Sequence, residues 1–127
     1  MVYYRPSPDG GFEFIVRDWK RSKKINKWGF GKWGKGPARE LADCNWSHYC
    51  LQQNLYKFFL EEKCGVGVKD MAIVVFHSSN KTFQEHTIPD MSSVVNAMLL
   101  QRYEEVHGIP YDFIPGCEVE THPFIFL

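Results

Sequence analysis

The chain has 127 residues, of which 44% are hydrophobic and 24% are charged, and its formal net charge is zero. This composition excludes a disordered chain, and no apolar run approaches the roughly 18 residues that a membrane-spanning helix requires. The N-terminal residues lack a signal-peptide hydrophobic region, and the four cysteines show no C-x-x-C pair and no zinc-type spacing. We therefore expect one intracellular domain, not secreted and not in a membrane, with reduced thiols, in which Cys50 and Cys64 are buried.

Charge is distributed unevenly along the chain. Nine of the fifteen basic residues lie between Arg17 and Arg39, a segment in which Asp18 is the only acid. Residues 103–127 contain acids but no lysine or arginine. A neutral protein with one basic segment is suited to binding a polyanion locally, although a solvated surface loop would show the same pattern.

The first part of the chain predicts a β-hairpin. Residues 8–11, with the sequence Pro-Asp-Gly-Gly, favour a turn, and β-forming residues occupy 2–5 and 12–19 on either side. Successive residues of a strand point to opposite faces. The apolar face of the second strand therefore continues to Asp18 and Lys20.

A long loop and a helix are expected next. Residues 21–37 combine lysines and aromatic residues with five glycines and prolines, which is typical of a loop. Helical spacing of apolar residues begins near Asp43 or Asn45, either of which can cap the helix. The helix is expected to end at Gly65.

The second half of the chain predicts two strands and a helix. Residues 71–77 are nearly all apolar, as in a central strand buried on both faces, and residues 82–88 alternate like a partner strand. A last helix is expected from Ser92 to about His107. The order β-β-α-β-β-α indicates an α/β or α+β domain with a mixed central sheet flanked by helices. Residues 109–127 form a proline-containing apolar tail, expected to pack on the core or on a partner chain.

Asp18 and Lys20 are the first candidate functional residues. Their spacing places a carboxylate and an ammonium group on the same face of a strand. A carboxylate can bind a hard divalent cation, and a lysine can steady an attacking water or a phosphate oxygen. A plain surface ion pair is the alternative interpretation.

Gln52 and Tyr56 are the second candidate pair. They are four residues apart on the expected helix and share one stripe with His48. Amide and phenol groups form hydrogen bonds without carrying charge, which suits them to hold a phosphate or a lysine beside a metal. Alternatively, they form an ordinary polar stripe at the edge of the core.

The order of these features resembles the PD-(D/E)xK nuclease superfamily, in its RecB-like exonuclease branch. The segments that carry the resemblance are residues 18–25 (DWKRSKKI), 34–37 (GKGP) and 48–57 (HYCLQQNLYK). They are similar to members found in large DNA viruses and eukaryotes. The resemblance runs from about Met1 to about Gln101, and it implies a truncated restriction-endonuclease-like core in residues 1–108.

The resemblance implies a role for each matching residue. Asp18 and the carbonyl group of Trp19 would ligate Mg²⁺ or Mn²⁺. Lys20 would stabilise the transition state or orient the water, and Gln52 and Tyr56 would position Lys20 and the DNA backbone. The implied catalytic set is therefore Asp18, Lys20, Gln52 and Tyr56, and the implied activity is hydrolysis of DNA.

The chain departs from the family pattern at its start. The family carries an aspartate on the strand before the hairpin, whereas the first acid here is Asp9, which lies in the turn. We expect either the C-terminal portion of a longer nuclease or a short protein that has lost half of its metal site. Metal binding and catalysis by this chain alone are expected to be weak, and a homodimer or domain-swapped oligomer is a natural response to truncation.

Two further functions agree with the sequence. The first is a non-catalytic nucleic-acid-binding module, for DNA or RNA, built on the basic aromatic loop at residues 20–39, with Trp28, Phe30 and Trp33 stacking on unpaired bases. Its expected phosphate contacts are Arg21, Lys23, Lys24, Lys27, Lys32, Lys35 and His48. The second is a protein-interaction or assembly domain, suggested by the apolar tail and the acidic last quarter of the chain.

Overall fold

The structure is a computed structural model that describes residues 1–108; the predicted tail at 109–127 lies outside the described residues. The elements are β1 (Val2–Pro6), β2 (Phe12–Arg21), the short 3-10 helix η1 (Gly36–Ala38), α1 (Asn45–Cys64), β3 (Val68–Phe76), β4 (Gln84–Thr87) and α2 (Ser92–His107). Apart from η1, this is the predicted order β-β-α-β-β-α. No helix in residues 1–108 has the length and apolar character needed to cross a bilayer.

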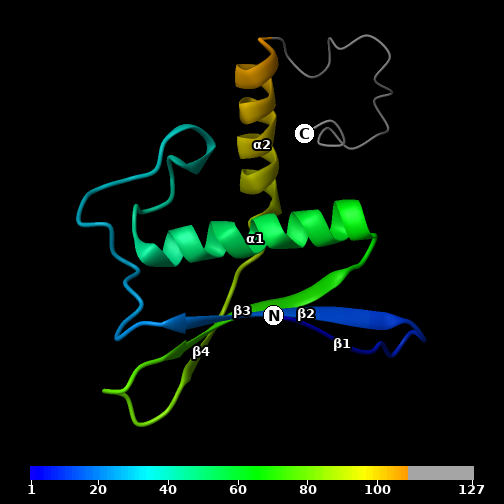
Figure 1. The fold of residues 1–127 in the computed structure, drawn as a ribbon. Helices are drawn as coiled ribbons and strands as arrows, with labels where there is room; N and C mark the ends of the chain where they lie inside the picture. The colour runs from blue at the N-terminus through cyan, green and yellow to red at the C-terminus, as the bar shows by residue number, and fades with distance from the viewer. Residues whose placement is uncertain (109–127) are drawn as a thin grey trace.

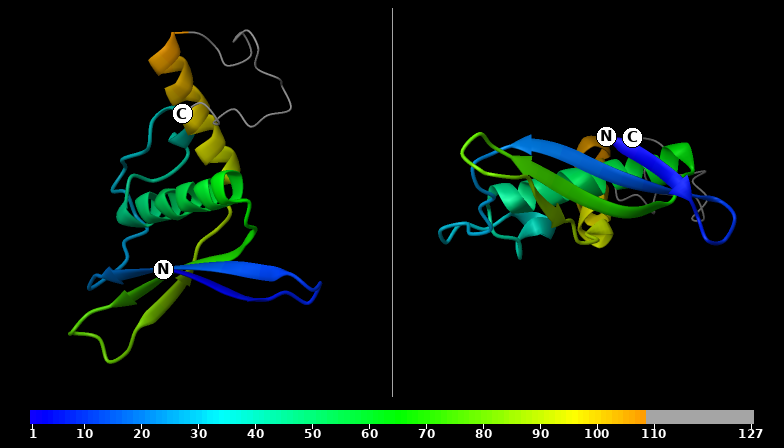
Figure 2. Two further views of the ribbon diagram at one scale, coloured as in Figure 1. Left: turned by 45° about the vertical axis from the view of Figure 1, so that its right-hand side comes forward. Right: turned by 90° about the horizontal axis from the view of Figure 1, so that it is seen from below.

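The four strands form one mixed sheet in the order β1-β2-β3-β4. β2 is antiparallel to β1 and parallel to β3, and β4 is antiparallel to β3. α1 lies across one face of this sheet, and α2 stands on α1 and points away from it (Figures 1 and 2). The fold is therefore α+β, but both described helices lie on the same side of the sheet instead of flanking it.

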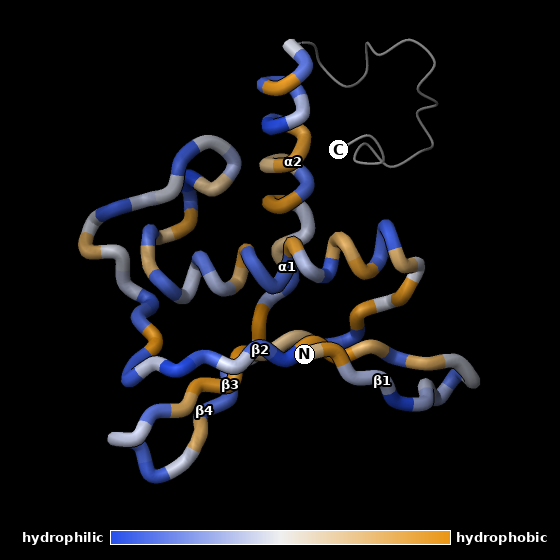
Figure 3. Tube along the Cα trace, in the orientation of Figure 1, coloured by the Kyte–Doolittle hydropathy of each residue, from blue (hydrophilic) through white to orange (hydrophobic). Residues whose placement is uncertain are grey.

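The main core lies between α1 and the inner face of the sheet. Strand alternation brings Val16 of β2 and Ile73 and Val75 of β3 to this face, where they pack with Cys50 of α1. The hydrophobic residues of β3 are visible as a continuous orange stretch in Figure 3. The same alternation carries Asp18 and Lys20 to the inner face, so the core continues directly into the candidate site.

A second, smaller core joins the two helices. Phe58 of α1 and Val95 of α2 are both buried, and leucines from both helices pack around them. α1 therefore has one apolar side towards the sheet and another towards α2. This double contact explains why apolar residues recur on more than one side of the helix.

α1 begins at Asn45, as predicted, but its capping residue differs from the prediction. The N-cap residue is Cys44, whose side chain forms no capping hydrogen bond, instead of Asp43 or Asn45. Both polar side chains have other partners: Asp43 Oδ1 lies 2.7 Å from His48 Nε2, and Asn45 Oδ1 accepts a hydrogen bond from the backbone N–H of Asn26. The expected end of the helix at Gly65 is confirmed.

The two helix cysteines differ in exposure. Cys50 is buried, as predicted, but Cys64 is exposed because it occupies the last position of α1. Burial raises the pKa of the Cys50 thiol to about 11, which keeps it protonated and unreactive at neutral pH.

We therefore expect iodoacetamide to alkylate Cys64 in the native protein and to spare Cys50. Peptide mass spectrometry after timed labelling measures both sites in one sample, and labelling in urea supplies the control in which both thiols react. Equal native labelling of the two cysteines would contradict the buried position of Cys50.

Candidate nucleic-acid interface

Asp18 and Lys20 form an ion pair where β2 approaches α1. Lys20 Nζ lies 2.8 Å from Asp18 Oδ2, and the two side chains are 22% and 25% exposed. Both residues sit beside core residues of β3, since Asp18 pairs with Ile73 and Lys20 with Val75. The pair therefore lies at the edge of the core and remains open to solvent on one side.

Lys20 is also held by α1. Its ammonium group donates a hydrogen bond of 3.1 Å to Gln52 Oε1 and lies 4.7 Å from the centre of the Tyr49 ring. An ammonium group has three N–H donors, so Asp18 and Gln52 leave one for an external acceptor such as a phosphate oxygen. The structure thus brings together three of the four predicted catalytic residues.

Tyr56 is the predicted residue that does not join this cluster. It lies one helical turn beyond Gln52, is 43% exposed, and its hydroxyl forms no hydrogen bond within residues 1–108. Tyr49 instead supplies the aromatic ring beside Lys20, and sequence reasoning missed it. Tyr49 precedes Gln52 by three residues, so the two share a face of the helix, and this spacing could have identified it.

The described residues do not by themselves fit a Mg²⁺ or Mn²⁺ site. Such ions prefer about six oxygen ligands, and Asp18 is the one carboxylate of this cluster. Within residues 1–108, no three His, Cys, Asp or Glu side chains lie close enough together to hold a metal ion. The Trp19 side chain lies on the opposite face, where its ring is 6.3 Å from that of Phe76, so only its backbone carbonyl is available.

The other carboxylates on these strands are already paired on the opposite face of the sheet. Glu13 Oε2 lies 2.9 Å from Arg5. Asp70 and Glu85 both contact Arg17, at 2.8 and 3.2 Å. None of them turns towards Asp18, because strand alternation places them on the other side.

The basic loop, defined as residues 22–39, leaves β2 next to this cluster and returns to the start of α1 (Figure 1). Backbone hydrogen bonds of 2.9 Å join Lys32 to Asp43 and Gly34 to Leu41. A side chain at position 29 could not be accommodated, because its Cβ would lie 2.6 Å from the Lys32 carbonyl oxygen. The loop thus has a defined conformation that is stabilised by backbone hydrogen bonds.

The basic loop presents aromatic rings to solvent. Trp28, Phe30 and Trp33 are 69%, 78% and 60% exposed. Phe30 also has a positive φ of 51°, a backbone conformation that is unfavourable for a bulky residue. Exposed rings on a constrained loop are available for stacking against flat ligands.

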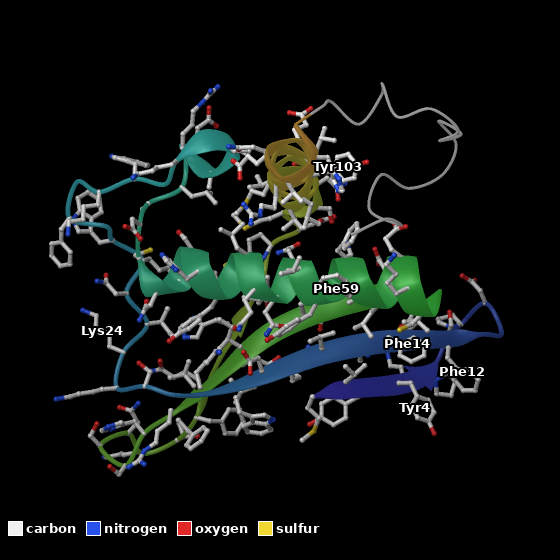
Figure 4. All side chains as sticks on the ribbon, turned by 45° about the horizontal axis from the view of Figure 1, so that its top comes forward. Tyr4, Phe12, Phe14, Lys24, Phe59 and Tyr103 are labelled. Carbon is white, nitrogen blue, oxygen red and sulfur yellow. The ribbon has the colours of Figure 1, made fainter. Side chains whose placement is uncertain are left out.

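Most of the predicted phosphate contacts carry uncompensated charge. Of the seven predicted contacts, five are exposed basic residues whose side chains form no ion pair within residues 1–108: Arg21, Lys23, Lys24, Lys32 and Lys35. Lys24 extends outward from the loop near the end of β2 (Figure 4). By contrast, Arg5, Arg17, Lys57 and Arg102 are paired with carboxylates elsewhere on the fold.

Two predicted phosphate contacts have intramolecular partners. Lys27 Nζ lies 4.3 Å from the centre of the Trp46 ring, and His48 Nε2 lies 2.7 Å from Asp43 Oδ1. The Lys27 contact therefore attaches the basic loop to α1, whereas the His48 contact joins α1 to the residue just before its N-cap. We expect both side chains to contribute less to binding than the unpaired lysines.

Gln53 is a buried polar residue that sequence reasoning did not single out. Its side chain is fully buried, and neither its amide nitrogen nor its amide oxygen has a hydrogen-bond partner in the described residues. Such a group destabilises the fold, since it loses its hydrogen bonds to water without replacing them. Nothing in the local pattern distinguishes it from Gln52, which is exposed.

Comparison with known proteins identifies no relative, since no family model, no curated protein and no solved structure matches this chain. Function is therefore inferred from the geometry of the residues. That geometry combines a lysine held by a carboxylate and an amide, with one free donor, and an adjoining loop that carries unpaired cations and exposed rings.

Proposed function

We propose that this chain carries part of a metal-dependent nuclease site that acts on DNA. The observation that supports the proposal is the cluster of Asp18, Lys20 and Gln52, in which β2 and α1 fix an ammonium group with one free donor. Lys20 binds a non-bridging oxygen of the phosphodiester group and neutralises the charge that develops on it. Gln52 and Asp18 act as positioning residues that hold Lys20.

Hydrolysis requires more carboxylate ligands than the cluster contains. Mg²⁺ or Mn²⁺ would supply a bound water and charge neutralisation in such an enzyme, but one carboxylate does not hold these ions firmly. A second copy of the chain, in a homodimer or a domain-swapped oligomer, is one source of further ligands. Sedimentation velocity, with and without Mn²⁺, tests whether the chain associates.

Substitution of the cluster tests the nuclease proposal. We expect Asp18→Asn and Lys20→Met each to reduce Mn²⁺-dependent cleavage of labelled DNA by about 100-fold or more, as loss of a preorganised charged group does in other enzymes. Lys81→Met, in the exposed turn between β3 and β4, is the matched control and should cleave as the unsubstituted chain does. Cleavage that survives both cluster substitutions would refute the assignment.

Binding without metal supplies a second measurement. In EDTA, Lys20→Met is expected to weaken DNA affinity about tenfold, because it removes one charged hydrogen bond to phosphate. Lys81→Met should leave the affinity unchanged. Equal affinities of the Lys20→Met variant and the unsubstituted chain would contradict a phosphate contact at Lys20.

A non-catalytic nucleic-acid-binding module is the second candidate function. The specific observation in its favour is that the donor set around Asp18 is too small for a resident cation, while the five unpaired basic residues need no metal. This function predicts DNA binding that is unchanged by EDTA, together with no cleavage at any Mn²⁺ concentration.

A further inference from the structure

The basic loop and the first half of α1 enclose a cleft next to the exposed rings. The cleft has a volume of about 270 Å³ and is lined by residues that include Trp33, Lys35, Leu41, His48 and Leu51. Its walls are therefore an indole ring and leucine side chains, with Lys35, His48 and Asp43 at polar positions. The Asp43 carboxylate is paired with His48, which leaves the Lys35 ammonium group as the unpaired charge of the cleft within residues 1–108. A cleft of this kind accepts a flat, partly apolar group that is attached to a negatively charged one.

We propose that the basic loop binds single-stranded nucleic acid, with one unpaired base in the cleft beside Trp33 and neighbouring bases stacked on Phe30 and Trp28. This inference rests on the proposed nucleic-acid function and names the state of the strand. The bases of a duplex are stacked on each other and paired, so their faces are not available to aromatic side chains. Unpaired bases offer free faces to such rings.

The loop backbone supports this assignment. Phe30 is held at a positive φ, and its ring is the most exposed of the three. Strained conformations of bulky residues persist where surrounding structure enforces them, and here a hydrogen bond of 2.9 Å from the Lys32 amide to the Gly29 carbonyl closes the turn that contains Phe30. The loop thus keeps an apolar ring in solvent, where a ligand can reach it.

The charges beside the rings fit a polyanion. Lys32 and Lys35 flank Trp33 in the sequence, and neither forms an ion pair within residues 1–108. A strand whose bases lie on the rings places its phosphates near these ammonium groups. A neutral hydrophobic partner would leave the same cations unpaired at the interface, which is unfavourable.

Fluorescence anisotropy in EDTA tests the proposal with two probes, a labelled thymidine oligonucleotide of about 20 nucleotides and a duplex of the same length. We expect the single strand to bind at least about tenfold more tightly than the duplex, since each base stacked on a ring adds to affinity. Trp33→Ala and Phe30→Ala should each weaken single-strand binding about tenfold and change duplex binding little.

Phe83→Ala is the matched control. Phe83 is 60% exposed, as Trp33 is, but it lies between β3 and β4, away from the basic loop. Its substitution should leave both affinities unchanged. Equal binding of single strand and duplex would overturn the proposal, as would equal losses from Phe83→Ala and Trp33→Ala, or self-association through the loop rings with no binding of either probe.

The inference and the proposed nuclease function can fail separately. Loop-dependent binding of single strands without any cleavage would support the inference and count against the nuclease site. Mn²⁺-dependent cleavage of duplex DNA that is unaffected by Trp33→Ala and Phe30→Ala would do the reverse. Circular dichroism of each variant verifies that the fold is retained, as expected for exposed side chains.

Discussion

Replacement of Asn54 by leucine is expected to lower the free energy of unfolding by about 3 kcal/mol, because it removes three hydrogen bonds made by a fully buried side chain. Asn54 is 1% exposed. Its amide nitrogen donates hydrogen bonds to the carbonyl oxygens of Cys50 and Pro89, at 2.9 and 3.0 Å. Its amide oxygen accepts a hydrogen bond of 2.8 Å from the Met91 backbone amide.

The two hydrogen bonds with Pro89 and Met91 attach the connection between β4 and α2 to the middle of α1. The Pro89 carbonyl and the Met91 amide immediately precede α2, so their loss also loosens the position of that helix on α1. Urea denaturation followed by tryptophan fluorescence measures the change in the free energy of unfolding. An Asn54→Leu variant as stable as the unsubstituted chain would show that these buried hydrogen bonds contribute little.

Gln53 provides a matched control at the preceding position of the same helix. It is buried to the same degree as Asn54 but has no hydrogen-bond partner in the described residues. Gln53→Met keeps the length of the side chain and removes the unsatisfied amide, so we expect the variant to be more stable by about 1 kcal/mol. Opposite signs for these neighbouring substitutions would show that partners, rather than burial alone, determine the contribution of a buried amide.

Local signals account for the parts of the fold that the sequence predicted. The hairpin follows from the Pro-Asp-Gly-Gly turn, and the end of α1 follows from Gly65, which adopts a φ of 65° there. The apolar run of β3 predicts a central strand. The placement of both helices on one face of the sheet was not predictable, because it depends on contacts between distant elements.

Periodicity also accounts for most of the candidate site. Asp18 and Lys20 share a face because strands alternate, and Gln52 faces them because of its position on α1. The same reasoning could not choose Tyr49 over Tyr56, since both lie on that side of the helix. Which of the two rings contacts Lys20 depends on the position of α1 relative to β2. That position is set by tertiary packing and not by local sequence.

The interactions of the basic loop show a second limit of sequence reasoning. Charge composition identifies the loop, but it does not distinguish Lys27, which lies over the Trp46 ring, from Lys32, which is unpaired. Likewise, His48 resembles a free phosphate contact until Asp43 is seen beside it. Loop conformation sets these pairings, and the glycines that determine it act through backbone contacts that no local pattern reveals.

The affinity of the chain for single-stranded DNA is expected to depend steeply on salt. If the five unpaired basic residues each contact a phosphate, the logarithm of the binding constant should fall with the logarithm of salt concentration with a slope of about −3.5. Affinity would then fall about 100-fold between about 50 and about 200 mM salt. A flat response would exclude phosphate contacts as the source of affinity.

Single substitutions within the basic loop sharpen this test. Lys32→Gln removes an unpaired cation and should reduce the steepness of the slope by about 0.7. Lys27→Gln is the matched control, because Lys27 is already held over the Trp46 ring and its loss should change the slope much less. The two variants carry the same net charge, so a difference between them reports the local partners of each lysine rather than the overall charge. Equal changes in slope for both would mean that the loop attracts DNA only through its total charge, with no defined phosphate contact at Lys32.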